Sequence, residues 1–134
     1  AIIDAREDVP EQVKNHNNGK LADYVIICTG ATPAIKDALS SINYGGTILF
    51  FAPTEPGIEI PFPLFDLWNK GVKMVPTYAG SPKDIAIAID LLKSRKVEVN
   101  DMITHKLPLS ETDKGFKLVA EANKSIKVVI EPQK

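Results

Sequence analysis

The chain has 134 residues, of which 44% are hydrophobic and 25% charged, so it can bury a core like that of an ordinary soluble domain. Its formal net charge is −1, with acids and bases interspersed, which argues against a nucleic-acid or anionic-membrane surface. No apolar run approaches the roughly 20 residues of a membrane span. The only cysteine, Cys28, excludes an internal disulfide and favours a reducing, cytoplasmic location.

The first elements predict the start of an α/β pattern. Residues 2–4 are expected to form a short strand, and Asp8 to cap a helix that has Pro10 in its first turn. The run at residues 15–19 ends that helix, since asparagine and glycine favour loops. The chain begins at Ala1 with no methionine and with a strand that needs neighbours. We therefore expect a fragment of a longer protein.

Residues 22–52 predict a strand–helix–strand unit, around which the rest of the chain is organised. Residues 24–28 are apolar and rich in β-branched side chains, as expected for a strand buried on both faces of a parallel sheet. A helix follows, which ends at a pair of glycines at residues 45–46, and residues 47–51 form a second buried strand. Such a unit is right-handed in nearly all known cases.

The helix inside this unit carries its own start signal and its own apolar stripe. Thr32 is expected to cap it, and Pro33 suits its first turn. The residues that share one face at helical spacing are Ile35, Ala38, Leu39 and Ile42.

Further elements extend the pattern. After a proline-rich irregular segment, residues 63–70 predict a helix that Gly71 ends, and residues 72–77 predict a third strand. Ser81 and Asp84 have the spacing of a capping box for the next helix. Its apolar stripe is Ile85, Ala88, Ile89 and Leu92.

The last third of the chain predicts another strand–helix–strand arrangement. Residues 102–107 and 127–131 are expected to be strands, and Ser110 with Asp113 to cap the helix between them, which runs to Lys124. The side chains expected to face inward from this helix are Phe116, Val119 and Ala120.

The residues that follow the strands are the candidate site. Ligands of open parallel sheets bind beyond the carboxyl ends of the strands, and the helix that begins near Pro33 adds amide donors there. We expect a crevice for a polar, anionic ligand, with Gly30 allowing the ligand to approach the backbone. The alternative is that small residues stand here simply to make tight turns. The residues at the three expected strand ends are Cys28, Thr29 and Gly30, then Phe51, Ala52 and Pro53, then Thr77.

Residues that could perform chemistry are few. The sequence has no glycine-rich G-x-G-x-x-G or Walker loop and no nucleophile elbow. Cys28 with the distant His16 and His105 does not make a convincing zinc ligand set. We expect Cys28 to be an inert buried thiol, His16 an exposed loop residue and His105 a structural one.

Taken together, five stretches resemble the C-terminal part of a zinc-type medium-chain dehydrogenase/reductase, the family of alcohol, sorbitol and threonine dehydrogenases. Their order and spacing cover essentially the whole chain, and the FDLW segment favours polyol or threonine dehydrogenases. The stretches are ADYVIICTG, GGTILFFAP, PFPLFDLWNKGVKMVPTYAGSPKD, MITHKLPLSETDKGFKLV and NKSIKVVIEP.

The resemblance implies an α/β fold class, a partial Rossmann fold with a doubly wound parallel sheet. Residues 1–78 would be the second half of a nicotinamide-dinucleotide-binding Rossmann domain, with residues 2–4 as its third strand. Residues 79–134 would return to, and complete, a GroES-like catalytic domain. The family's zinc ligands, glycine-rich loop and ribose-binding acid would all precede Ala1, so no catalytic or metal-binding residue is carried over to this chain.

The resemblance also assigns cofactor-binding roles, residue by residue. The crevice would be lined by Cys28, Thr29 and Gly30. The nicotinamide would lie along Phe51, Ala52 and Pro53. Its carboxamide would meet backbone groups of Val75 and Thr77. Lys127 would lie near the cofactor pyrophosphate, where its charge suits a phosphate.

The leading hypothesis is an NAD- or NADP-dependent, zinc-containing oxidoreductase that oxidises a small-molecule secondary alcohol or polyol as a homo-oligomer. This chain would supply crevice walls and part of the subunit interface, and would be inactive alone. One alternative is a truncated, non-catalytic nucleotide-binding or interaction module that assembles through its exposed sheet edge. A methyltransferase-like Rossmann half is a weaker third hypothesis, because the glycine-rich first turn is absent.

Overall fold

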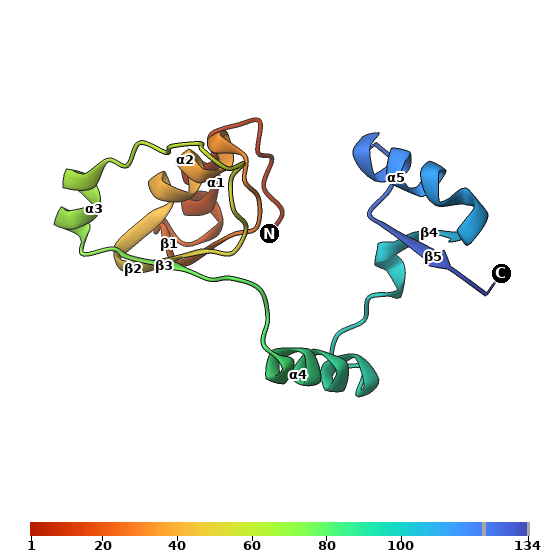
Figure 1. Ribbon diagram of the computed structural model, residues 1–134. Helices are drawn as coiled ribbons and strands as arrows, with labels where there is room; N and C mark the ends of the chain where they lie inside the picture. The colour runs from red at the N-terminus through yellow and green to blue at the C-terminus, as the bar shows by residue number, and fades with distance from the viewer. Residues whose placement is uncertain (122, 134) are drawn as a thin grey trace. The chain divides into compact units, whose positions relative to one another are not determined.

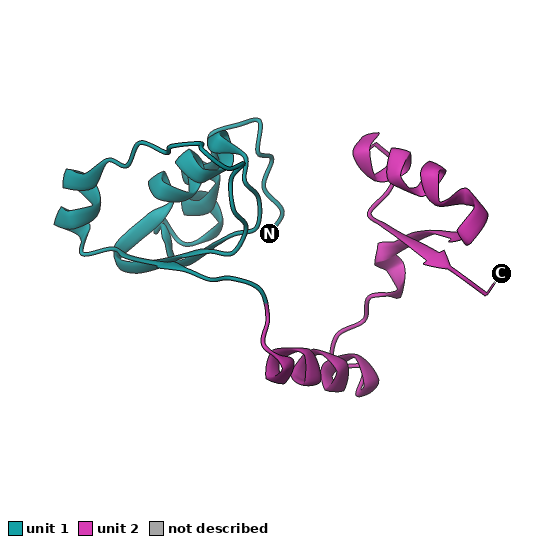
Figure 2. Ribbon diagram, viewed as in Figure 1, with its two compact units in different colours: residues 1–79 teal, residues 80–134 magenta. Residues whose placement is uncertain are grey.

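The computed structural model describes residues 1–121 and 123–133, which divide into two compact units, Ala1–Ala79 and Gly80–Lys134 (Figure 2). Both units combine helices with parallel strand pairs, which confirms the predicted α/β class. Assignment of the two parts to a nicotinamide-binding domain and a catalytic-domain segment stays a prediction. Among the described residues, no helix is long and apolar enough to cross a membrane.

The described part of the first unit is built on a three-stranded parallel sheet with the order β1-β2-β3 (Figure 1). Its strands are β1 (Ala22–Ile27), β2 (Ile42–Phe50) and β3 (Lys73–Pro76). Its helices are α1 (Val9–His16), α2 (Thr32–Ser40) and α3 (Leu64–Lys70). Because spatial order follows chain order, α2 and α3 each lie in the connection between two neighbouring parallel strands.

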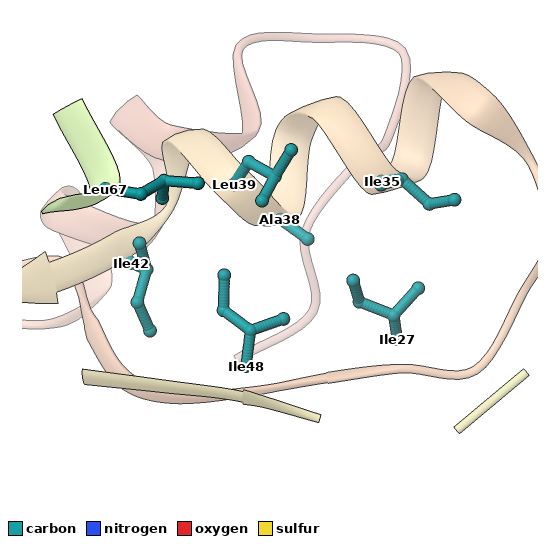
Figure 3. Close-up of a cluster of buried hydrophobic side chains, with 7 residues drawn as sticks. All are labelled: Ile27, Ile35, Ala38, Leu39, Ile42, Ile48 and Leu67. Atoms are coloured by element: carbon teal, nitrogen blue, oxygen red, sulfur yellow. The ribbon is translucent and has the colours of Figure 1, made fainter. Parts of the chain in front are cut away.

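The core of this unit lies where α2 packs on the sheet. Figure 3 shows the α2 side chains pointing toward those of β1 and β2, with Leu67 of α3 beside them. Ile42 and Ile48 are fully buried, as expected for β-branched residues in a covered strand. The buried cluster comprises Ile27, Ile35, Ala38, Leu39, Ile42, Ile48 and Leu67.

Two strand predictions for this unit are wrong. Residues 2–4 do not form a strand, and Ile2 is 98% exposed, because a strand requires a hydrogen-bonded neighbour. The strand predicted for residues 24–28 ends at Ile27 and is not buried on both faces, since Tyr24 and Ile26 stand 79% and 61% exposed. Alternate β1 side chains point to opposite faces, and only one of these faces packs against α2.

The boundaries of α2 also differ from prediction. Its N-cap is Ala31, and Thr32 makes no capping hydrogen bond, although Pro33 does occupy the first turn. The helix ends at Ser40, so Ile42 already belongs to β2. The glycine pair at residues 45–46, predicted to end the helix, instead lies inside β2.

These glycines form an irregularity in the sheet. Pairing moves from Ala22 opposite Ile42 directly to Tyr24 opposite Thr47, so β2 has extra residues at this point. Gly45 there has a φ of +68°, a left-handed conformation that glycine adopts without strain. Gly45 therefore belongs to a bulge in β2 and does not end α2.

The second unit begins with α4 (Pro82–Lys93), whose predicted capping box is confirmed. The Ser81 hydroxyl accepts a hydrogen bond from the Asp84 backbone N–H at 3.3 Å, and the Ser81 N–H donates to the Asp84 carboxylate at 2.8 Å. The predicted apolar stripe of α4 is present in sequence, but within the described structure its side chains are exposed.

The remainder of the unit is a parallel pair, β4 (Ile103–Pro108) and β5 (Lys127–Glu131), joined through α5 (Thr112–Glu121). Short 3₁₀ turns, η1 (Asn100–Met102) and η2 (Leu109–Glu111), precede β4 and α5. Gly115 of α5 is buried and packs closely on the strands, since a Cβ built there would lie 3.2 Å from the Ile130 Cδ1 atom.

Three expectations for α5 are wrong. Ser110 lies inside η2, and it is the Thr112 hydroxyl that donates to the Leu109 carbonyl at 2.6 Å. Lys124 lies outside the helix, whose described part ends at Glu121. The residues predicted to face inward, Phe116, Val119 and Ala120, are exposed. Phe116 and Val119 lie on the Gly115 side of the helix but line an open hollow beside Val128 and Ile130 instead of being covered.

Candidate functional site

The carboxyl ends of β1, β2 and β3 lie in one row along one edge of the sheet. Ile27 pairs with Phe50, and Phe50 pairs with Pro76, and each of these is the last residue of its strand. The segments that leave the sheet after them therefore start side by side. This is the edge at which ligands of open parallel sheets bind, so the structure brings together most of the residues that the sequence predicted.

Backbone hydrogen bonds continue beyond the strand ends and fix these segments. The Ile27 carbonyl accepts hydrogen bonds from the N–H groups of Phe51 and Ala52, both at 3.0 Å. The Thr77 N–H donates to the Phe50 carbonyl at 3.1 Å. Because the Thr77 amide is engaged within the sheet, a ligand at this end would meet its carbonyl oxygen or its hydroxyl.

The segment after β1 makes a tight turn before α2. The Thr29 hydroxyl accepts a hydrogen bond from the Ala31 N–H at 3.3 Å, and α2 begins at the next residue. The first N–H groups of α2 thus lie near the same edge, where they favour an anion. Gly30 stands in this turn and faces the backbone of Pro53 and Thr54.

The side chains at this edge are accessible, and Cys28 corrects an expectation. It was predicted to be a buried thiol on a strand, but it lies just beyond β1 and is exposed. Phe51 is 60% exposed, which leaves an apolar ring surface at the edge. Thr54 is half-buried against Gly30 and was not foreseen, because its contact is made by its backbone and leaves no sequence pattern.

Two predicted residues lie elsewhere. Val75 is inside β3, opposite Leu49 and one residue before the strand end, with 45% of its surface exposed. Lys127 is the first residue of β5, in the second unit, where it is exposed. A role for Lys127 beside a cofactor stays a prediction.

The shifted pKa values of two carboxyl groups outside this edge follow from local hydrogen bonds. The Arg6 guanidinium beside Asp4 holds the pKa of that carboxyl below its usual value. Hydrogen bonds from Ser81 lower the pKa of Asp84 in the capping box. Within residues 1–121 and 123–133, no group of three or more histidine, cysteine, aspartate or glutamate side chains could hold a metal ion.

The histidines are not at the edge. His16 is exposed, as predicted, but it is the last residue of α1 and not a loop residue. His105 lies in β4, where its Nδ1 is 3.0 Å from the Thr104 hydroxyl, consistent with the structural role expected for it.

Comparison with known proteins identifies the family. The family model described as "Zinc-binding dehydrogenase" matches residues 1–94 of this chain. The chain belongs to the zinc-binding dehydrogenase family. This confirms the resemblance to zinc-type medium-chain dehydrogenases.

Named relatives include a sorbitol dehydrogenase from Halalkalibacterium halodurans, 31% identical over 97% of this chain and 38% of its own length. A D-arabitol-phosphate dehydrogenase from Enterococcus avium is 30% identical over 97% of this chain and 37% of its own length. The chain therefore spans little more than a third of the length of the curated relatives it matches.

Solved structures confirm the fold. An alcohol dehydrogenase from Thermus sp. ATN1 superposes with a TM-score of 0.82 at 24% identity, covering 96% of this chain and 38% of that one. An alcohol dehydrogenase from Thermotoga maritima gives 0.81 at 19% identity, covering 96% and 35%. The predicted partial Rossmann fold is thereby confirmed.

Proposed function

We propose that this chain forms half of the nicotinamide-cofactor site of an NAD- or NADP-dependent dehydrogenase that oxidises a small secondary alcohol or polyol. The observation that carries the proposal is the alignment of the β1, β2 and β3 carboxyl ends with the start of α2, in a member of the zinc-binding dehydrogenase family. Relatives named for sorbitol and D-arabitol phosphate support a polyol-type substrate.

The roles of the edge residues follow from their chemistry. Cys28, Thr29 and the N–H groups at the start of α2 would face the polar part of the cofactor. Phe51 offers an apolar ring surface for the flat nicotinamide. Val75 and Thr77, at the end of β3, are proposed to offer backbone carbonyl oxygens to its carboxamide. Lys127 is proposed to pair with the pyrophosphate.

When bound, the nicotinamide would accept the hydride that the alcohol loses. Residues of this chain would hold and orient the ring and keep water from one side of it. The described residues do not fit a zinc site, so we assign the zinc that the family implies to residues outside this chain. We accordingly expect the 134-residue chain alone to show no dehydrogenase activity, and we expect it to contribute to a homo-oligomer interface.

Binding of NADH to the natural full-length polypeptide tests this proposal, with turnover of sorbitol and related polyols followed by NADH absorbance. Loss of an aromatic contact costs about 1 kcal/mol, which is about fivefold in affinity. We therefore expect Phe51→Ala to weaken NADH binding about fivefold.

Phe65→Ala is the matched control. Phe65 lies on α3 and is 73% exposed, so its truncation removes a similarly accessible ring away from the strand ends and should leave NADH affinity unchanged. Equal effects of the two substitutions, or binding of S-adenosylmethionine in preference to NADH, would contradict the proposed site.

A further inference from the structure

The backbone of one crevice wall occupies the space where a side chain would stand at Gly30. A Cβ built on Gly30 would overlap the carbonyl oxygen of Pro53, and would lie only 3.1 Å from the Thr54 Cα and 3.2 Å from the Pro53 carbonyl carbon. Ordinary van der Waals contacts of a Cβ are longer than these. Glycine at residue 30 thus permits backbone-to-backbone packing between two segments that leave the sheet.

The same two segments are joined a few residues earlier. The Ile27 carbonyl accepts hydrogen bonds from the N–H groups of Phe51 and Ala52, both at 3.0 Å. The segment that leaves β2 is therefore attached to the segment that leaves β1 at residues 51–52 and again at residues 53–54. These contacts fix the positions of Phe51, Ala52 and Pro53 relative to the end of β1.

This packing changes the role that the sequence predicts for Gly30. A glycine after a parallel strand suggests room for a ligand, but here the space beside its Cα is filled by Pro53 and Thr54. We propose that Gly30 is a positioning residue, which seats residues 51–54 against the end of β1 and so sets the nicotinamide wall of the crevice. The proposal rests on the proposed function for the identity of the ligand.

An alanine at residue 30 could not be accommodated by a side-chain movement. The overlapping atom belongs to the backbone, and the pyrrolidine ring of Pro53 fixes its φ, so relief of the overlap requires the backbone of residues 53–54 to move. Displacement of a binding wall by about 1 Å can cost up to about a hundredfold in function. At Gly80, by contrast, the nearest atom to a built Cβ is the Asp84 Cβ at 3.8 Å, which is an ordinary contact.

The experiment is a double-mutant cycle in the natural full-length polypeptide, read by NADH dissociation constant and by apo-protein melting temperature. We expect Gly30→Ala to weaken NADH binding about tenfold or more, and the matched control Gly80→Ala to leave it unchanged. Pro53→Gly frees the φ of residue 53, so that its carbonyl can turn away. The double variant should therefore regain much of the affinity that Gly30→Ala loses.

Each outcome is decisive. Wild-type affinity in Gly30→Ala overturns the proposal, and so does an additive cycle, which would mean that Gly30 contacts the ligand itself. If Gly30→Ala does not fold, rescue of its folded yield by Pro53→Gly supports the proposal and absence of rescue contradicts it. If the wild-type protein does not bind NADH, the proposed function fails, while coupling of the two residues in melting temperature still tests the contact.

Discussion

Two neighbouring isoleucines of β1 lie on opposite faces of the strand, one buried and one exposed. Truncating each to alanine measures how much each face contributes to the free energy of unfolding. Ile27 is 4% exposed in the core against α2, whereas Ile26 is 61% exposed on the other face. Removing the methyl and methylene groups of a buried isoleucine costs about 0.8 kcal/mol per carbon in transfer free energy, to which a cavity term is added. We therefore expect Ile27→Ala to destabilise the first unit by about 3 kcal/mol and Ile26→Ala by about 1 kcal/mol or less.

Urea unfolding of the 134-residue chain, followed by far-ultraviolet circular dichroism, gives both free energies. The two units need not unfold together, so amide hydrogen exchange in β2 is used to measure the stability of the first unit alone. Equal losses for Ile26→Ala and Ile27→Ala would refute the packing of β1, since the two substitutions remove the same atoms. The same pair in the natural full-length polypeptide would show whether further sequence covers Ile26.

Three local predictions follow from the helix ends. Ser81→Ala removes the cap of α4 and should cost about 1 kcal/mol of helix stability by circular dichroism, whereas Thr32→Ala should change little because Thr32 makes no cap. Gly71→Ala places a Cβ at a φ of +65° in open space, so thermal melting should show a loss of about 1 kcal/mol without a steric clash. Because the pKa of Asp84 is lowered, its stabilisation of α4 is complete above the ordinary carboxyl pKa and is lost as pH falls through the lowered value. The helicity of α4 should fall over the same acid range, and Asp84→Asn should abolish this pH dependence.

The outcome that contradicts each of these is specific. Equal costs for Ser81→Ala and Thr32→Ala would mean that the capping box does not act as the hydrogen bonds indicate. A Gly71→Ala variant as stable as wild type would argue against the left-handed helix end. An acid transition unchanged in Asp84→Asn would assign the pH dependence to another group.

Signals confined to a few neighbouring residues were predictable from the sequence. The capping box at Ser81 and Asp84, the helix-ending Gly71 and the cap at Asp8 each depend on local hydrogen bonds or on local backbone geometry. They act at the same positions in almost any tertiary context. That is why these helix ends were found correctly.

Features that depend on a distant partner were not predictable in the same way. Residues 2–4 have strand composition but pair with no strand of the described structure. Phe116 belongs to an apolar stripe of α5 that stands largely exposed. The glycine pair at residues 45–46 suits a helix end and a bulge equally well, and only pairing with β1 decides between them.

The candidate site shows the same division. Its place was predictable, because the ends of parallel strands meet at one edge and chain order gave the strands. The contact between Gly30 and Pro53 was not, since it joins backbones that are more than twenty residues apart. Likewise, the sequence predicts that Thr77 offers backbone groups to a ligand, but it does not show that the Thr77 N–H is already engaged by the Phe50 carbonyl.

The most direct test of the central claim is hydrogen exchange of the natural full-length polypeptide with and without NADH. We predict that NADH protects residues 28–31, 51–54 and 75–77, where the strand ends and the start of α2 meet. We predict no change at residues 42–46, which form the opposite end of β2. NADH binding that protects the opposite end, or that leaves the strand ends unprotected, would contradict the assignment of this edge as the cofactor site.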